Sequence, residues 1–198
     1  MTAPAKLGAA RGLPREVRII GGLWKRSKLP VADTPGLRPT PDRVRETLFN
    51  WLGQDLTGWR CLDAFAGSGA LGFEAASRGA SEVLLLERDR NLARSLNDSK
   101  QRLKATQVRV ESADALAWMA RCLPDAFELI FIDPPFDARL FDAALDATPR
   151  VVVPHGFVYL EADRVFTPDE LGRRGLRVHR LGRAGTVHFH LLQRLASP

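Results

Sequence analysis

The chain has 198 residues, of which 45% are hydrophobic and 26% are charged, and this composition fits one globular domain with a small appendage. No stretch approaches the ~20 apolar residues of a membrane-spanning helix, and the start lacks the apolar core expected of a signal peptide. The two cysteines, Cys61 and Cys122, belong to no metal-ligand or redox motif, which indicates a reduced, cytoplasmic protein.

Positive charge is concentrated at the start of the chain. The formal net charge is +6, yet residues 1–45 contain ten Lys or Arg and three acids, which gives +7 and leaves about −1 for the rest. Such a segment is either a solvated tail or a surface for a polyanion. Residues 1–14, rich in Ala, Gly and Pro, are expected to be disordered. Residues 15–40 are expected to form a basic hairpin and linker.

Two short runs, Val17–Ile20 and Leu23–Arg26, predict a β-hairpin with its turn at Gly21-Gly22. Trp24 stands among cations, so it is either a core residue or an aromatic group that packs on RNA, and the sequence supports both equally. The neighbouring cations are Lys25, Arg26 and Lys28.

A helix is expected to begin after the linker. Thr40 can cap it, with Pro41 in its first position and Asp42 in its first turn. Three arginines lie at or just before the start of this helix and could contact phosphates: Arg38, Arg43 and Arg45.

From residue 59 onward the pattern alternates between strand and helix. Strands are expected over 61–65, 82–87, 107–112, 127–132 and 157–160, and helices over 69–78, 90–104, 115–123 and 139–148. Thr167 can cap a further short helix, and residues 176–181 and 187–194 are expected to pair as an antiparallel hairpin. We therefore predict an α/β fold with a doubly wound, mainly parallel seven-stranded sheet and an antiparallel C-terminal hairpin.

The motif at residues 133–136 follows a buried strand. Its two prolines end that strand, because proline cannot donate to the ladder and restricts the residue before it. A carboxylate from Asp133, a carbonyl from Pro134 and the ring of Phe136 are then presented together, with Pro135 between them. Ligands bind at this edge of an open α/β sheet. A planar base with an amino group would suit the site, although an isolated match is more often a simple turn.

A glycine motif and four acids predict a cofactor site. Gly67-Ser-Gly69-Ala-Leu-Gly72 matches the dinucleotide pattern, but alone it also fits a tight strand-to-helix turn. Asp63, Glu87, Asp114 and Asp133 lie near the ends of four successive strands. These carboxylates would repel a pyrophosphate, whereas the ammonium, ribose and adenine amine of S-adenosylmethionine would find acceptors. Asp63 would serve the methionine end, Glu87 the ribose and Asp114 the adenine.

These motifs resemble those of class I methyltransferases, and the N-terminal segment narrows the resemblance. Ile19-Ile-Gly-Gly22, Lys28-Leu-Pro30, Leu37-Arg-Pro-Thr40 and residues 42–51 closely resemble the bacterial ribosomal small subunit methyltransferase D family. The similarity runs from about Val17 to Arg194. Phe65 departs from the glycine of many class I enzymes, a change that this subfamily tolerates.

The resemblance implies methyl transfer from S-adenosylmethionine to the exocyclic N2 of guanine 966 in 16S ribosomal RNA. The resemblance implies that residues 41–198 form the methyltransferase domain. It also implies a monomer that acts on the small ribosomal subunit, without a metal ion and away from membranes. The implied catalytic residues are Asp133, Pro134, Pro135 and Phe136. The implied cofactor residues are Asp63, Phe65, Gly67, Gly69, Glu87, Arg88, Asp114, Ala115 and Asp133. The RNA-binding candidates are Trp24, Lys25, Arg26, Lys28, Arg38, Thr40, Arg43 and Arg45.

Three alternatives compete with this interpretation. An adenine-N6 methyltransferase would use the same Asp-Pro-Pro-aromatic motif, and a nicotinamide-dependent oxidoreductase would use the glycine motif. An RNA-binding factor could keep the fold without catalysis. His188 and His190 share one face of the last strand but lack a third ligand, so they are expected to be ordinary strand residues.

Overall fold

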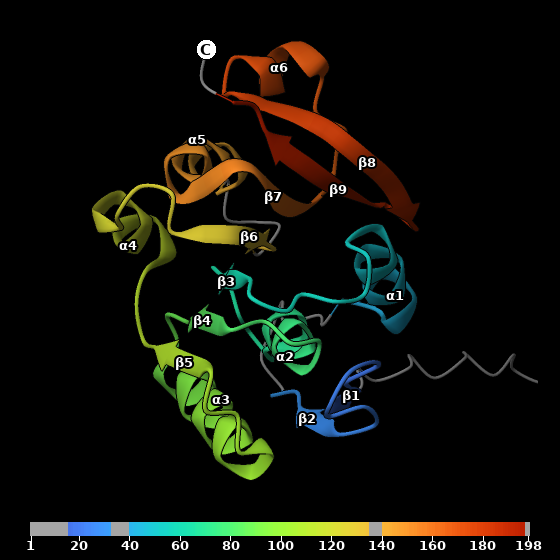
Figure 1. The fold of residues 1–198 in the computed structure, drawn as a ribbon, viewed down its shortest axis with the longest axis vertical. Helices are drawn as coiled ribbons and strands as arrows, with labels where there is room; N and C mark the ends of the chain where they lie inside the picture. The colour runs from blue at the N-terminus through green and yellow to red at the C-terminus, as the bar shows by residue number, and fades with distance from the viewer. Residues whose placement is uncertain (1–15, 33–39, 135–139, 197–198) are drawn as a thin grey trace, which may run out of the picture.

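The computed structural model describes residues 16–32, 40–134 and 140–196, and its centre is a seven-stranded sheet (Figure 1). The strand order is β5-β4-β3-β6-β7-β9-β8, parallel from β5 to β7 and antiparallel at β9 and β8. This arrangement confirms the predicted fold class. The strands are β3 (Arg60–Asp63), β4 (Glu82–Leu86), β5 (Val108–Glu111), β6 (Phe127–Ile132), β7 (Val152–Ala162), β8 (Leu176–Ala184) and β9 (Val187–Arg194).

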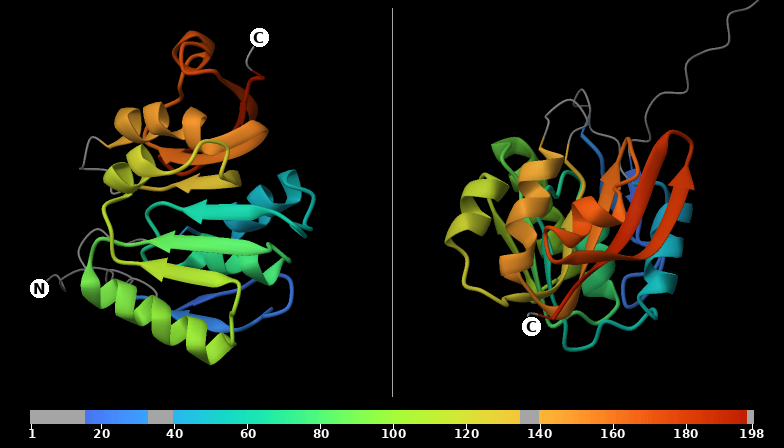
Figure 2. Two further views of the ribbon diagram at one scale, coloured as in Figure 1. Left: turned by 60° about the vertical axis from the view of Figure 1, so that its left-hand side comes forward. Right: turned by 90° about the horizontal axis from the view of Figure 1, so that it is seen from above.

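Helices cover both faces of the sheet (Figure 2). One buried cluster joins the sheet to α1, α2 and α3 through residues such as Leu48, Phe73 and Leu96, and a second joins it to α4, α5 and α6. Because both faces are covered, β4 and β6 carry nearly continuous apolar runs. The helices are α1 (Asp42–Trp51), α2 (Ala70–Ser77), α3 (Arg90–Leu103), α4 (Ala115–Arg121), α5 (Phe141–Val151) and α6 (Pro168–Gly172).

Most boundaries lie within two residues of the prediction, but β7 is longer than expected. It runs from Val152 to Ala162 because it pairs with β6 on one side and with β9 on the other, over residues 157–162. Thr167 caps α6 as predicted, and Glu170 completes a reciprocal capping box. No helix in the described part of the chain is long and apolar enough to cross a membrane.

The N-terminal hairpin is confirmed, but the prediction of its return strand is wrong. β1 (Glu16–Arg18) pairs antiparallel with β2 (Lys28–Pro30), so the return begins at Lys28 and not at Leu23. Val17, Ile19 and Leu29 are buried in the same cluster as the residues of α1 and α2. The hairpin is therefore docked on the main domain.

The backbone at the predicted turn is bonded to α2 instead. The amides of Ile20 and Gly21 each donate to the Glu74 carboxylate at 2.8 Å, and the amide of Leu23 donates to Ser77 O at 2.7 Å. Gly22 has a φ of +71°, and a Cβ there would lie 1.8 Å from the Ser77 carbonyl oxygen. A two-residue turn at Gly21-Gly22 would have paired the backbone groups of Ile20 and Leu23 with each other, but their amides are bonded to α2. The close approach of Gly22 to Ser77 requires glycine at that position.

Candidate functional site

Acidic side chains gather at the carboxyl edge of the parallel strands. Asp63 ends β3 and is in register with Phe131 of β6, while Glu87 directly follows β4 and Asp133 follows β6. Because parallel strands end at one edge, the three carboxylates are brought together, as predicted. Electrostatic coupling links Asp63 with both Glu87 and Asp133.

The glycine loop lies between β3 and α2. Gly67 and Gly69 have φ values of +51° and +76°, which other residues rarely adopt. A Cβ at Gly69 would approach Leu96 and Phe73 within 2.7 Å, so the close packing of this loop requires glycine. Both the backbone conformation and the close packing of this loop therefore require glycine.

Glu87 is bonded to this loop. Its Oε2 accepts the amide of Gly67 at 2.9 Å, and its Oε1 accepts the amide of Asp89 at 2.8 Å. The amide of Ala113 donates to the Glu87 carbonyl, which brings the segment before α4 alongside. There Asp114 is exposed and caps α4 by accepting the Ala117 amide at 2.9 Å. Glu87 therefore fixes the loop, and Asp114 is a helix cap with one carboxylate oxygen still open.

Asp63 is buried, with 2% of its surface exposed, and its Oδ2 accepts the Gly72 amide at 3.0 Å. Burial raises the pKa of Asp63 to about 7, although the bond from Gly72 opposes this effect and the charge of Glu87 adds to it. A cationic group would favour the ionised form of Asp63. The chemistry therefore fits the ammonium of an amino acid.

The strand that precedes Asp133 ends as predicted, and Asp133 is half-buried next to the buried Pro134. Burial raises the pKa of Asp133 well above its usual range, and the charges of Glu161 and Asp63 raise it further. Pro135 and Phe136 lie outside the described residues, so their predicted roles stay predictions.

Thr40 does not cap α1, which corrects the prediction. Pro41 occupies the cap position without a side-chain bond, while the Thr40 hydroxyl donates to Asp133 Oδ2 at 3.4 Å. The same hydroxyl is hydrogen-bonded to Glu161. Thr40 is buried, and so it belongs to the site and not to the exposed helix end.

Sequence reasoning missed Glu161, a buried acid on β7. It is 6% exposed, and the Tyr159 hydroxyl donates to its Oε1 at 2.8 Å. Burial raises the pKa of Glu161, while its bonds to Thr40 and Tyr159 lower it. The available signal was an acid directly after the apolar run 157–160, two residues after Tyr159.

The remaining predicted cofactor residues surround this edge. Phe65 is half-buried, Arg88 is exposed and Ala115 is buried at the start of α4. Together the glycine loop and the acidic acceptors fit S-adenosylmethionine. Within residues 16–32, 40–134 and 140–196, no cluster of three or more His, Cys, Asp or Glu could hold a metal ion.

The predicted RNA contact of Arg45 is wrong. Its side chain is fully buried and forms ion pairs with Glu74 at 3.2 Å and Asp42 at 2.6 Å. It also donates to the carbonyls of Arg18, at 2.7 Å, and Thr40, at 3.2 Å. Arg45 therefore joins the hairpin, α1 and α2, and it cannot reach a phosphate.

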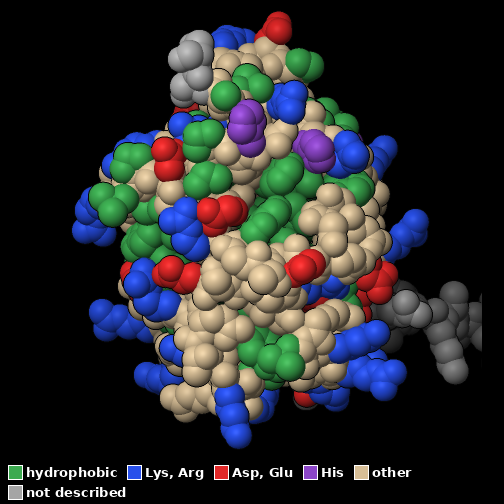
Figure 3. Space-filling model, viewed as in Figure 1, with side chains coloured by type: hydrophobic (Ala, Val, Ile, Leu, Met, Phe, Trp, Pro, Cys, Tyr) green, Lys and Arg blue, Asp and Glu red, His purple; other side chains and the backbone are tan. Residues whose placement is uncertain are grey.

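The other basic candidates are on the surface, where Lys and Arg side chains line much of the rim in Figure 3. Lys25, Arg26 and Arg43 are exposed, and Lys28 is exposed in an ion pair with Glu16 at 2.7 Å. Trp24 is half-buried against the core, which favours its structural role. Arg38 lies outside the described residues.

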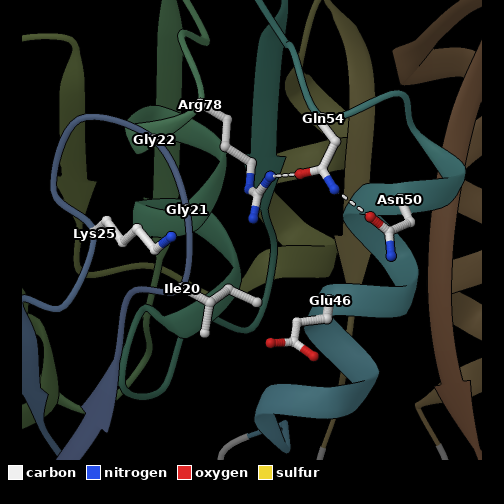
Figure 4. A pocket seen from close by; sticks show the side chains of 8 residues that line it. All are labelled: Ile20, Gly21, Gly22, Lys25, Glu46, Asn50, Gln54 and Arg78. Atoms are coloured by element: carbon white, nitrogen blue, oxygen red, sulfur yellow. Dashed lines mark hydrogen bonds between the residues drawn. The ribbon is translucent and has the colours of Figure 1, made fainter.

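A groove of about 480 Å³ separates the hairpin from α1, and Lys25 and Glu46 point into it from opposite sides (Figure 4). Arg78 is hydrogen-bonded to Gln54, and Gln54 to Asn50, along its wall. The groove carries both signs of charge and lies away from the acidic edge. It is lined by Ile20, Gly21, Gly22, Lys25, Glu46, Asn50, Gln54 and Arg78.

The strand order, the glycine loop and the acidic edge define a class: the Rossmann-like methyltransferases, whose cofactor is S-adenosylmethionine. A family model described as Conserved hypothetical protein 95 matches residues 17–193. The chain belongs to this family, and its resemblance to the proteins named ribosomal RNA small subunit methyltransferase D is confirmed.

Individual relatives support this assignment. Ribosomal RNA small subunit methyltransferase D of Escherichia coli K12 is 42% identical over 188 residues, covering 91% of each chain. The Haemophilus influenzae protein of the same name is 42% identical over 162 residues, or 78% of this chain and 84% of its own. The solved structure of yhhF from Escherichia coli superposes with a TM-score of 0.80 at 36% identity, covering 92% of this chain and 99% of the other.

Proposed function

We propose that this protein methylates 16S ribosomal RNA at the exocyclic N2 of one guanine, which the family resemblance makes guanine 966. Support for ribosomal RNA as the substrate comes from the names of relatives that cover most of the chain. The observation that supports an exocyclic amine as the target is the position of Asp133 and Pro134, which present acceptors beside the acidic edge, and the family resemblance makes this amine guanine N2. An exocyclic amine has two hydrogens to donate to them.

In this mechanism, S-adenosylmethionine supplies the methyl group on an already activated sulfonium. Glu87, Asp63 and Asp114 would hold its ribose, ammonium and adenine groups, and the backbone of the glycine loop could approach it closely. Asp133 and the Pro134 carbonyl accept the two amine hydrogens and orient the nitrogen lone pair towards the methyl group. Positioning is the main contribution, since the reacting atoms need to lie about 3–3.5 Å apart and in line.

The target base must leave its stack to enter this site, because the acceptors lie at the edge of a sheet and not in a groove that admits a duplex. Phe136 would stack on the extruded base. RNA outside the site would follow the exposed cations of the hairpin and of the start of α1. We further infer that a monomer acts on the small ribosomal subunit in the cytoplasm.

The deciding experiment incubates the protein with labelled S-adenosylmethionine and small subunits that lack the modification. We expect one N2-methylguanosine in 16S RNA, located by mapping the labelled nucleotide. Asp133→Ala should reduce the rate by about 10²-fold or more, because the amine loses its charged acceptor, but should leave substantial cofactor binding. Glu82→Gln, an exposed change at the opposite end of β4, is the matched control.

Analysis of the modified nucleoside separates this function from its alternatives. Recovery of N6-methyladenosine would replace it with the adenine-directed activity that the same motif permits. Near-normal methylation by Asp133→Ala would reject the role of Asp133, and RNA binding without any turnover would indicate a non-catalytic factor.

A further inference from the structure

Two carboxyl groups, the half-buried Asp133 and the buried Glu161, are joined by one hydroxyl at the proposed methyl-transfer site. The Thr40 hydroxyl lies 3.4 Å from Asp133 Oδ2 and is also hydrogen-bonded to Glu161. Glu161 additionally accepts the Tyr159 hydroxyl at 2.8 Å. The position of Thr40 is itself fixed, because its carbonyl accepts Arg45 Nε at 3.2 Å. The three side chains thus form a continuous path for a proton.

The surroundings of this path disfavour two negative charges. Burial raises the pKa of both Asp133 and Glu161, the charge of Glu161 raises that of Asp133 further, and Asp63 contributes in the same direction. Tyr159 stays neutral because its pKa is raised. Among the described residues, no Lys, Arg or His forms an ion pair with Asp63, Asp133 or Glu161. Close carboxyl groups in such a place share one proton.

We propose that Glu161 is a positioning residue that holds this shared proton, so that Asp133 presents a carboxylate to the amine of the target base. The inference rests on the proposed function. Docking of the amine adds hydrogen-bond donors to Asp133 alone, and Glu161 is the more deeply buried of the two. Both effects place the negative charge on Asp133 and the proton on Glu161.

The transfer conserves protons. When Asp133 holds the shared proton, it donates to the Thr40 oxygen and the Thr40 hydroxyl donates to Glu161. As the Asp133 proton passes to the Thr40 oxygen, the Thr40 proton passes to Glu161, so Asp133 loses one O–H bond, Thr40 exchanges one and Glu161 gains one. The result is the arrangement in the structure, in which the Thr40 hydroxyl donates to Asp133. Asp133 is then ionised before methyl transfer. As the N–CH₃ bond forms and the electron pair of the broken C–S bond stays on sulfur, the nitrogen must lose one proton, which an ionised Asp133 can accept and a protonated one cannot.

Glu161→Gln tests the proposal because glutamine has the shape of a protonated glutamate. Its amide oxygen can accept the Tyr159 hydroxyl, and its amide nitrogen can donate to Thr40. We expect a single-turnover rate within about threefold of the wild type and an acid limb of the pH–rate profile that coincides with it. Glu161→Ala should lower the rate at least tenfold at unchanged RNA affinity, since Thr40 and Tyr159 both lose their hydrogen-bond partner. Glu82→Gln serves as the control for loss of a carboxylate.

An infrared measurement provides a readout that needs neither RNA nor turnover. Above pH 8, where Asp63 is ionised, the wild type should show a protonated-carboxyl band that Glu161→Gln removes, and Thr40→Val should shift this band by removing the bridging hydroxyl. The Thr40 variant also serves if the Glu161 variants do not fold.

Several results would overturn the inference. They are a band that neither variant changes, a 10²-fold loss of rate in Glu161→Gln, or an acid limb of that variant displaced to lower pH. The last two would mean that Glu161 is the ionised member of the pair. If the wild type fails to methylate guanine N2 but shows the band, the proposed function fails and the shared proton stands. Guanine methylation without the band rejects the shared proton alone.

Discussion

The proposed contact of Asp63 with the ammonium of S-adenosylmethionine would couple cofactor binding to the release of a proton. In the free protein the pKa of Asp63 is raised by burial to about 7, so that much of it is protonated at neutral pH. A bound ammonium favours the carboxylate and must expel that proton. We therefore expect S-adenosylmethionine affinity to rise with pH and to level off above about 7. Calorimetry in two buffers of different ionisation enthalpy measures the released proton directly.

Asp63→Asn should remove this pH dependence. The amide oxygen of asparagine can still accept the Gly72 amide, so the loop keeps its anchor, but the charged bond to the ammonium is lost. A charge-assisted hydrogen bond contributes about 1.5–3 kcal/mol, so we expect roughly tenfold weaker binding at pH 8. Asp98→Asn, an exposed change on α3, should have no effect. A pH slope that survives in Asp63→Asn would assign the proton to another group.

Single residues also show what the sequence can and cannot predict. Asp63, Glu87 and Asp133 were placed correctly, because the end of a parallel strand fixes a position whatever the details of packing. The burial of Arg45 could not be predicted, because a charged side chain is expected on the surface and its neighbour Val44 was expected to face the core. In the structure both side chains are buried. The buried partner of Arg45, Glu74, stands 29 residues away, so no local pattern shows the pair.

At the scale of elements, Arg45 and Glu74 join the hairpin, α1 and α2. Glu74 accepts the amides of Ile20 and Gly21 and pairs with Arg78 at 2.9 Å. Arg45→Met should leave Glu74 buried without one of its cations, and breaking such a pair costs about 3–5 kcal/mol. We expect a loss of this size in the free energy of unfolding by denaturant titration.

The exposed Arg94→Met on α3 is the matched change and should alter stability by less than about 0.5 kcal/mol. Hydrogen exchange adds a local test, because a weakened Glu74 contact should speed exchange at the amides of Ile20 and Gly21. Equal stability of the two variants would show that Arg78 alone compensates the buried charge of Glu74 when Arg45 is absent.

The same contacts explain which elements could be predicted. The alternating strands and helices are determined by apolar periodicity that each segment carries itself, and the structure reproduces them closely. The hairpin turn is different, because its backbone bonds run to Glu74 and Ser77, more than fifty residues away. Gly21-Gly22 correctly indicated an unusual backbone but not the helix that requires it.

Over the whole molecule, charge divides between an acidic cofactor edge and a basic N-terminal segment. The hairpin is part of the common core and is hydrogen-bonded to Glu74, so deleting it would disturb the fold together with any RNA contact. Substitutions of its exposed cations separate the two effects. Lys25, Arg26 and Lys28 are exposed, and none of them is part of the buried network.

Replacing Lys25, Arg26 and Lys28 together with alanine should weaken RNA binding and reduce its salt dependence. Each lost phosphate contact lowers the slope of log affinity against log salt by about 0.7–0.9, and the ion pair of Lys28 with Glu16 reduces its share, so we expect a decrease of about 2. S-adenosylmethionine affinity should not change. The control replaces three exposed arginines on α4, α6 and β8, or beside them, with alanine: Arg121, Arg173 and Arg180. An equal decrease in both triple variants would mean that RNA responds to net charge alone, and an unchanged slope in the hairpin variant would leave these cations as solubilising charge.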